Sequence, residues 1–233
     1  MADEHPAAAI WPPARLRIRT GNLELRLPRD EELVQLADLA ARGVHDPATM
    51  PFESPWTDVP DQELRRNLYA WHASNRSSSD PDAWALLLGV FESGQVVGAQ
   101  DIGARRFAVR RTVASGSWVG REHQGRGIGT TMRRAVLHFA FDSLGALEAR
   151  SGAYVDNPGS NRVSERCGYE PDGTNVRERR RGETAPGGAS SERVLEQRWR
   201  ITREQWLRLE PLDVQVTGLD DELRAMLGAA ASD

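Results

Sequence analysis

Residues 115–140 read SGSWVGREHQGRGIGTTMRRAVLHFA. An apolar strand end leads into the glycine-rich turn Gln124-Gly125-Arg126-Gly127-Ile128-Gly129, and apolar residues at helical spacing follow it. Glycines allow successive backbone N–H groups to approach an anion without a Cβ in the way. A helix that begins at such a turn points its dipole and its unpaired N–H groups at the same spot. The stretch therefore predicts a cradle for a diphosphate, with no metal ion implied.

The spacing of the glycines separates this turn from two other phosphate-binding loops. A P-loop needs a lysine directly after its glycines, and this chain contains no lysine. A dinucleotide-binding fingerprint follows the first strand of a βαβ unit, whereas this turn lies in mid-chain after strands that look antiparallel. A plain glycine turn between a strand and a helix remains the alternative.

Length and composition predict a soluble globular protein with one main domain. The chain has 233 residues, 39% of them hydrophobic and 27% charged, and a net charge of −4. This charge gives no argument for binding to nucleic acid or to a membrane. All 30 basic residues are arginine, so the protein offers no lysine for self-acylation. One cysteine, Cys167, excludes an intramolecular disulfide and leads us to expect a reducing, cytoplasmic location.

Apolar patterns divide the first half of the chain into elements. We expect a strand pair over residues 16–27, helices over 30–41 and 61–75, a strand pair over 84–91 and 96–102, and a strand over 112–119. Between the two helices, residues 43–60 carry four prolines and form an irregular loop, whose apolar side chains suit either a groove wall or packing over the core. Residues 105–111 hold four arginines, which predicts an exposed connection.

The second half begins with the helix after the glycine turn. Its apolar positions face the sheet, whereas Arg133 and Arg134 are predicted to face out. We expect a strand over 147–155, a short helix over 158–167, a mobile loop over 174–191, a strand over 194–201 and a small strand-helix pair at the end. The resulting division is a flexible arm (residues 1–14), a main domain (15–210) and a short appendage (211–233).

Four short motifs along the chain resemble one family. Q-x-x-G-x-G between a strand and a helix resembles the acyl-CoA-binding motif of the GNAT N-acyltransferases. Gly116-x-Trp118, Asn157-x-x-Ser160-Asn161 and Cys167-Gly168-Tyr169 are similar to its ribosomal-protein N-acetyltransferase (RimJ/RimL-like) branch. VHDPATMPFESPWT, SGSWVG and YVDNP also look similar to a mycobacterial subgroup of succinyl-CoA-dependent transferases. Over residues 15–228 the resemblance implies an α/β (α+β) fold: a mixed, mostly antiparallel sheet with a strand splay, flanked by helices.

The resemblance implies how an acyl-CoA is held. The strand end at residues 118–120 offers free backbone groups to the pantetheine, as an added strand would. The N–H groups of the glycine turn hold the diphosphate, and Asn157 resembles a family residue that bonds the pantetheine; its alternative role is a helix cap. The expected cofactor-binding residues are Trp118, Val119, Gly120, Gln124, Gly125, Arg126, Gly127, Ile128, Gly129, Thr130, Asn157 and Ser160.

The implied reaction is direct attack of an amine on the thioester through a tetrahedral intermediate. Ser160 matches the residue proposed to protonate the leaving thiolate, and the Val119 N–H suits the oxyanion. The general base is uncertain in identity, because the position of the branch's usual glutamate is Ala114 here. A water chain, Asp101, or the pair His45 and Asp46 remain the candidates.

The donor and acceptor stay open at this point. We expect Met50, Phe52, Trp56 and Asp101 to contact substrate. The donor is acetyl-CoA or succinyl-CoA; a succinyl group needs a cation near its far carboxylate, and the sequence assigns no arginine to that task. The acceptor amine belongs to a protein N-terminus, a lysine or a small molecule, and a homodimer is left open.

Two other hypotheses compete with the enzyme. The first is a non-catalytic acyl-CoA-binding module, which the missing glutamate favours. The second, weaker one is nucleic-acid binding through the arginines of residues 105–111 and 177–181. We expect neither nucleic acid nor a membrane as a partner.

Overall fold

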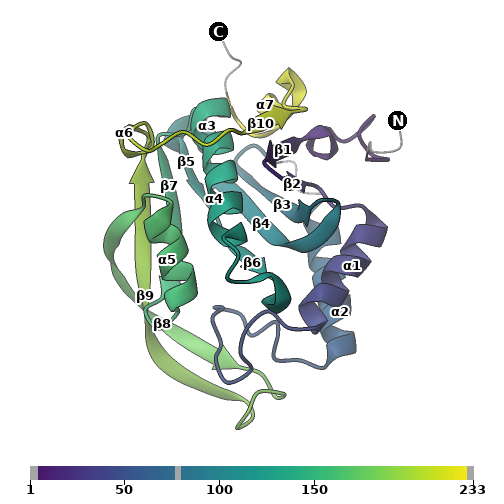
Figure 1. Ribbon diagram of the computed structural model, residues 1–233, viewed down its shortest axis with the longest axis vertical. Coiled ribbons are helices and arrows are strands. Elements are labelled where there is room, and N and C mark those ends of the chain that lie inside the picture. The colour runs from purple at the N-terminus through teal and green to yellow at the C-terminus, as the bar shows by residue number, and fades with distance from the viewer. Residues whose placement is uncertain (1–4, 77–79, 230–233) are drawn as a thin grey trace.

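A ten-stranded sheet lies between helices in the computed structural model, which describes residues 5–76 and 80–229 (Figure 1). Residues 1–4 of the predicted arm and 230–233 of the predicted appendage lie outside the described residues. The strand order is β10-β1-β2-β3-β4-β5-β7-β9-β8, and β6 pairs with β4 beside this path. Within the described chain only the β5–β7 pair is parallel, so the sheet is mixed and mostly antiparallel, as the resemblance implies.

The strands follow the predicted pattern except at residues 112–119, which form two strands, and at residues 174–191, which belong to a hairpin. The ten strands are β1 (Arg17–Thr20), β2 (Leu23–Arg26), β3 (Ala83–Glu92), β4 (Gln95–Arg105), β5 (Thr112–Ala114), β6 (Ser117–Val119), β7 (Glu148–Tyr154), β8 (Glu170–Arg181), β9 (Ser190–Thr202) and β10 (Gln215–Thr217).

Helices cover both faces of the sheet. The α-helices are α1 (Asp30–Ala41), α2 (Asp61–Asn75), α3 (Phe107–Arg110), α4 (Ile128–His138), α5 (Pro158–Arg166), α6 (Arg203–Trp206) and α7 (Asp221–Met226). Short 3-10 turns lie at Pro12–Arg15 and Arg121–His123, and a π-helical turn, Phe139–Ser143, continues α4. No helix among the described residues is both long enough and apolar enough to span a bilayer.

Strand alternation separates two apolar cores. Leu86 and Leu88 of β3 point toward α4, which buries Ile128 and Met132 against them. On the other face α1 and α2 pack together, and Phe91 belongs to their core. We therefore refer to an α4 face and an α2 face of the sheet.

The predicted strand over residues 112–119 is wrong in one respect: it is two strands with a break at Ser115 and Gly116. β5 pairs with β7 in parallel, whereas β6 pairs only with β4. The Gly116 N–H donates to Asp101 Oδ1 at 2.6 Å, and Gln100 Nε2 donates to the Gly116 carbonyl at 2.7 Å. These bonds hold β6 to β4 after β7 has diverged, which is the strand splay.

The arginine-rich residues 105–111 form the largely exposed connection that their charge predicts, with Phe107 as the exception. Phe107 is completely buried, with its ring centroid 5.9 Å from that of Trp84. Arg111 donates to the Gly145 carbonyl through two nitrogens. One aromatic side chain therefore anchors the segment in the core while its arginines reach outward, a balance that a count of charges misses.

The predicted mobile loop over 174–191 is also wrong, because these residues form most of the long β8–β9 hairpin. Arginines of β8 alternate along the strand and find acids on both sides. Arg177 pairs with Glu196 at 2.8 Å, and Arg179 pairs with Asp156 at 2.5 Å and Glu192 at 3.2 Å. Ion pairs between opposite charges on β8 and β9 stabilise the pairing of these two polar strands, so the segment is strand and not a mobile loop.

The two ends of the chain meet at the far edge of the sheet. β10 pairs with β1, and Leu223 of α7 is fully buried. Arg15 pairs with Asp220 at 2.6 Å and with Glu222 at 2.9 Å. The division into an arm, a main domain and an appendage stays our proposal.

The end of the β8–β9 hairpin is fastened to residues 43–60, the proline loop (Figure 1). Arg181 Nε lies 2.7 Å from Asp58 Oδ2, and both side chains are about nine-tenths buried. Arg181 also donates to the carbonyls of Pro47 at 2.7 Å and Ala48 at 3.2 Å. A Cβ on Gly182 would lie 2.0 Å from the Asp58 carbonyl oxygen, so the two segments touch through their backbones.

Replacing Arg181 by methionine should release the proline loop without unfolding the protein. The change leaves Asp58 as an unpaired buried carboxylate, and the loop relieves this by opening locally. We expect amide hydrogen exchange across residues 46–58 to accelerate by about tenfold or more, which corresponds to about 1.4 kcal/mol of local stability. The control is Arg180→Met, whose side chain is exposed on the opposite side of β8. Equal exchange in the two variants would contradict the clamp.

Candidate functional site

The glycine turn and the start of α4 form an open concave surface. Gly125 and Gly127 have φ of 77° and 84°, a region that favours glycine, and a Cβ on either would meet no atom within 4 Å. Gly127 is the N-cap of α4, whose first N–H groups have no carbonyl partners within the helix. The space in front of this turn therefore suits an anion.

Gln124 fixes the turn to its neighbours. Its Nε2 donates to the carbonyl of Val44 at 2.6 Å and to the carbonyl of Val119 at 2.8 Å. One side chain thus joins the glycine turn, the end of β6 and the start of the proline loop. Gly120 lies under α1, where a Cβ would come within 2.5 Å of Leu39.

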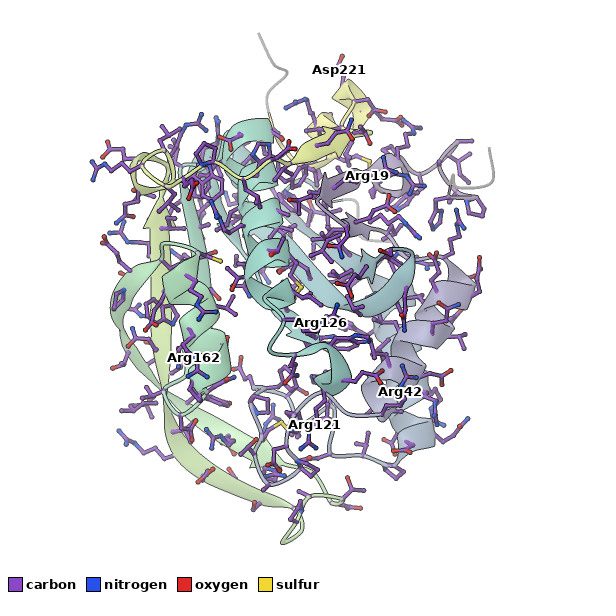
Figure 2. All side chains as sticks on the ribbon, viewed as in Figure 1. Arg19, Arg42, Arg121, Arg126, Arg162 and Asp221 are labelled. Atoms are coloured by element: carbon purple, nitrogen blue, oxygen red, sulfur yellow. The ribbon has the colours of Figure 1, made fainter. Side chains whose placement is uncertain are left out.

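A cavity of about 560 Å³, the cofactor cavity, opens on the α4 face beside this turn. It brings together most of the residues that the sequence analysis selects: Met50, Phe52, Trp118, Val119, Gln124, Gly125, Gly127, Ile128, Gly129, Thr130, Asn157 and Ser160. Gly120 and Arg126 do not line it. The Arg126 guanidinium pairs with Glu92 at 2.9 Å instead. Figure 2 shows Arg126 at the turn and Arg162, which lines the cavity, across from it on α5.

The edge of β6 turns hydrogen-bonding groups toward the splay. Gly120 N–H donates to the Val97 carbonyl at 2.9 Å, and Asp101 N–H donates to the Gly116 carbonyl at 2.9 Å. Because paired and unpaired residues alternate in an antiparallel ladder, the N–H groups of Ser117 and Val119 point away from β4. They are directed at the gap that β7 leaves.

The start of α5 forms the opposite wall of the cofactor cavity. Asn157 caps the helix, since its Oδ1 accepts from the Ser160 N–H at 3.1 Å. Asn161 donates to the Tyr154 carbonyl at 3.0 Å and accepts from Trp199 Nε1 at 2.9 Å. The capping role of Asn157, one of two alternatives in the sequence analysis, is confirmed, and its side chain still borders the cavity.

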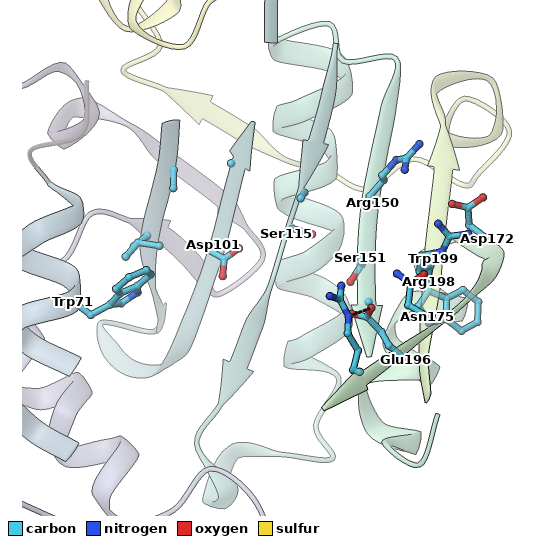
Figure 3. A pocket seen from close by; sticks show the side chains of 16 residues that line it. Trp71, Asp101, Ser115, Arg150, Ser151, Asp172, Asn175, Glu196, Arg198 and Trp199 are labelled. Carbon is cyan, nitrogen blue, oxygen red and sulfur yellow. Dashed lines mark hydrogen bonds and ion pairs between the residues drawn. The ribbon is translucent and has the colours of Figure 1, made fainter. Parts of the chain in front are cut away.

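Two adjoining cavities lie on the α2 face. One of about 720 Å³, the aromatic cavity, is bounded by α2, the proline loop and β6; Trp56 and Asp101 lie here rather than in the cofactor cavity. The other, of about 490 Å³, continues over β5, β7 and β9 and shares Trp71, Leu87 and Asp101 with it. Figure 3 shows Trp71 of α2, then Asp101 and Ser115 on the sheet, with the charged side chains of Arg150, Asp172, Glu196 and Arg198 beyond them.

The cavities of the two faces meet at β6. Phe52, Ser117 and Trp118 line both the cofactor cavity and the aromatic cavity. Ring centroids lie 5.2 Å apart for Phe52 and Trp56, and 5.8 Å apart for Trp56 and Trp118. A molecule held on the α4 face can therefore be reached through the splay from the α2 face.

Asp101 is the acidic side chain beside this meeting point. Burial raises the pKa of its carboxyl group, while the N–H of Gly116 and the charge of Arg133 oppose this rise. A carboxylate with a raised pKa is a better proton acceptor than an exposed one. Of the other base candidates, His45 Nε2 lies 2.6 Å from Thr57 Oγ1, and Asp46 Oδ1 accepts from the Ala48 N–H.

Arg133 does not face out as predicted; it is 3% exposed and lines the cofactor cavity. Its guanidinium donates to Ser117 Oγ and Ser151 Oγ, each at 2.9 Å, and to Gln100 Oε1 at 3.4 Å. All three acceptors are neutral, and no ion pair found among the described residues includes Arg133. The helical pattern of α4 did not predict this burial, because the polar partners of Arg133 come from three strands that are distant in the sequence.

Cys167 takes no part in this chemistry. It is buried beneath α4, where its Sγ donates to the Thr130 carbonyl at 3.6 Å. Burial raises the pKa of its thiol to about 11, so the nucleophilic thiolate is scarce at neutral pH.

Several residues of the two cavities escaped the sequence analysis. Arg133, Ser117 and Ser151 surround the splay, while Trp71 and His72 of α2 form the far wall of the aromatic cavity. Burial lowers the pKa of His72 to about 4, so this wall is neutral at physiological pH. In the sequence, the one sign of the buried Arg133 was that Ser117 and Ser151 are polar residues at strand positions that face the core.

Solved structures share this fold at low sequence identity. RimJ from Mycobacterium smegmatis in complex with a CoA-disulfide has a TM-score of 0.62 at 19% identity, covering 82% of this chain and 87% of that chain. RimL, a ribosomal L7/L12 alpha-N-protein acetyltransferase in complex with coenzyme A, has 0.56 at 18%, covering 78% and 96%. A chimera of spermidine N-acetyltransferase SpeG from Vibrio cholerae and hSSAT has 0.55 at 19%, covering 81% and 100%.

A family model independent of these structures matches the sequence itself. It describes an acetyltransferase (GNAT) domain and covers residues 22–170, which is more than half of the chain. This span holds β2 to β7, the glycine turn, α4 and α5, and therefore the whole cofactor cavity apart from Arg179. The protein belongs to the GNAT acetyltransferase family.

Proposed function

We propose that this protein transfers an acyl group from coenzyme A to an amine that enters from the α2 face. The observation that carries the proposal is the junction at β6, where Phe52, Ser117 and Trp118 border cavities on both faces of the sheet. Positioning two reactants on either side of one gap supplies much of the rate when the thioester is already reactive.

Coenzyme A fits the residues of the α4 face. The open N-terminal end of α4, with Gly125, Gly127 and Thr130, would hold the diphosphate, and the outward N–H groups of β6 would bond the pantetheine. Asn157 would add a bond from α5. The bound thioester supplies the activated carbonyl; the chain supplies the orientation.

Asp101 is our candidate for the base that takes the amine proton. It borders the aromatic cavity beside β6, and its burial raises its pKa toward the range in which a carboxylate accepts protons readily. The Val119 N–H is our candidate donor to the oxyanion, and the Ser160 hydroxyl is our candidate proton source for the leaving thiolate. Met50, Phe52 and Trp56 would enclose the acyl group and the acceptor.

Arg133 favours a donor whose acyl group ends in a carboxylate. A buried guanidinium is expensive to desolvate, and neutral hydroxyl and amide oxygens do not neutralise its charge. A succinyl carboxylate in the cofactor cavity would do so with a charge-assisted bond. We therefore place succinyl-CoA beside acetyl-CoA as the proposed donor.

Release of free thiol from acyl-CoA in the presence of mixed amines tests the proposed function. We expect release that depends on both an amine and the acyl-CoA. Binding of coenzyme A without release for any amine would instead favour a non-catalytic acyl-CoA-binding module.

Substituting Gly127 by alanine should weaken coenzyme A binding. The new Cβ would project into the open space before α4 and strain a residue at positive φ. We expect the dissociation constant for coenzyme A, measured by calorimetry, to rise by about tenfold, which is about 1.4 kcal/mol. Gly21→Ala, also at positive φ with open space around it, is the control for backbone strain. Loss of the same size in both variants would refute an anion site at Gly127.

The pH dependence of Asp101→Asn should reveal a raised pKa. Because the folded-state pKa exceeds the unfolded value of 3.8, the native protein binds the extra proton between the two values, and stability falls as pH rises through that window. Asp101→Asn should therefore unfold at a higher temperature than the natural protein at neutral pH, with no difference well below the unfolded pKa.

The same substitution should abolish the acidic limb of kcat/KM, which in the natural protein follows protonation of the base. Asp213→Asn, at an exposed position, serves as the control for both measurements. An unchanged acidic limb in Asp101→Asn would exclude Asp101 as the base.

Substituting Arg133 by methionine should change donor preference. If Arg133 binds a terminal carboxylate, kcat/KM for succinyl-CoA should fall by about tenfold or more relative to acetyl-CoA, since a charge-assisted bond contributes about 1.5–3 kcal/mol. Arg134→Met, the neighbouring arginine of α4 that bonds the Glu210 carbonyl, is the matched control. A ratio of the two donors that stays constant would leave Arg133 with a structural role only.

A further inference from the structure

The aromatic cavity has a composition that restricts what can occupy it. Its walls come from the proline loop, α2 and the strands β3, β4 and β6, and most of the lining side chains are apolar, among them Phe52, Trp56, Leu68, Trp71, Leu87 and Trp118. Trp71 is 60% exposed and lines this cavity, so its indole face is accessible to a molecule that enters. The volume of about 720 Å³ lies within the range of small-molecule sites.

The charge of this cavity is a single negative group. Among the described residues that line it, Asp101 is the one acid, and there is no arginine. His72, the other titratable group there, is neutral because burial lowers its pKa to about 4. A cavity lined by one carboxylate and by several aromatic side chains attracts one cation, through the negative charge and through the ring quadrupoles.

We propose that the acceptor is a small primary monoamine with an apolar, aromatic-sized body, seated in the aromatic cavity with its nitrogen at Asp101. The inference rests on the proposed function, whose acceptor it specifies. In the reaction the bound ammonium gives one proton to Asp101, the freed amine nitrogen forms a bond to the acyl carbon, and the carbon–sulfur bond breaks. The second proton lost from nitrogen balances the proton that the leaving thiolate takes up.

Charge argues against the other acceptor classes. A polyamine carries several cations, whereas the aromatic cavity offers one acid, and the two further acids of the adjoining cavity, Asp172 and Glu196, are paired with arginines. A nucleotide needs cations around its phosphates, and this cavity offers none among its described residues. A protein N-terminus would have to pass the wall formed by the proline loop, which Arg181 holds to the β8–β9 hairpin through Asp58 and two loop carbonyls.

Calorimetry with coenzyme A-saturated protein tests the contributions of the amino group and of the aromatic ring separately. The probes are phenethylamine, ethylamine, phenethyl alcohol and spermidine. We expect phenethylamine to bind about tenfold or more tightly than ethylamine, because burial of the ring removes apolar area from water. We also expect it to bind more tightly than its neutral isostere phenethyl alcohol and than spermidine. Ethylamine or spermidine binding as tightly as phenethylamine would overturn the proposal.

Two variants separate the contribution of the aromatic wall to amine binding from the contribution of the Asp101 charge. Trp71→Ala should weaken phenethylamine about tenfold and leave coenzyme A binding unchanged. Asp101→Asn should remove the preference for phenethylamine over phenethyl alcohol while the alcohol binds as before, which a merely structural loss would not do. Val109→Ala, exposed on α3, is the control. An unchanged amine-to-alcohol ratio in Asp101→Asn would contradict the seat at Asp101.

Acylation assays separate this inference from the proposed function. A peptide with an N-terminal phenylalanine that reacts at a lower KM than phenethylamine would overturn the small-molecule acceptor in favour of a protein terminus, with the acyltransferase intact. Failure of coenzyme A to bind would overturn the proposed function. In that event, phenethylamine titrated into the protein alone still reports on the cavity: tight binding supports a site for an aromatic amine, and no binding refutes it.

Discussion

The break in the strand at Gly116 is the constraint on which the site depends. Asp101 accepts the Gly116 N–H, and Gln100 donates to the Gly116 carbonyl, so β6 stays with β4 while β7 diverges. Without these two bonds β6 could continue the parallel pairing that β5 begins with β7. The gap between β6 and β7, and the outward N–H groups of Ser117 and Val119, follow from this local geometry.

A buried arginine and a half-buried aspartate lie on opposite faces of the sheet near this break. Arg133 reaches up from α4 to Ser117 and Ser151, and Asp101 faces the aromatic cavity. Their separation by the sheet explains why Arg133 only partly offsets the rise that burial produces in the pKa of Asp101. Each charge is therefore left able to interact with a group that enters from its own side.

The long β8–β9 hairpin connects the periphery of the fold to the site. Arginines of β8 pair with acids across the hairpin, and the last residue of β8, Arg181, binds Asp58 of the proline loop. The loop in turn supplies Phe52 and Trp56 to the cavities. A segment that looks like a polar linker in sequence thus supports the wall of an apolar cavity, because ion pairs and strand pairing act together.

The sequence by itself determined the glycine turn, α4 and the family, and offered helix capping as one of two roles for Asn157, because these depend on local backbone chemistry and on residue spacing. Only the tertiary structure decided that Phe107 is buried, that residues 174–191 belong to a β-hairpin, that Arg133 lies inside and that Trp71 and Asp101 line one cavity. Each of these depends on partners distant in the chain: three strands receive Arg133, and two segments about thirty residues apart bring Trp71 to Asp101. The local sequence pattern reports the intrinsic conformational and burial preference of each residue, whereas contacts with distant segments determine whether the folded protein follows that preference.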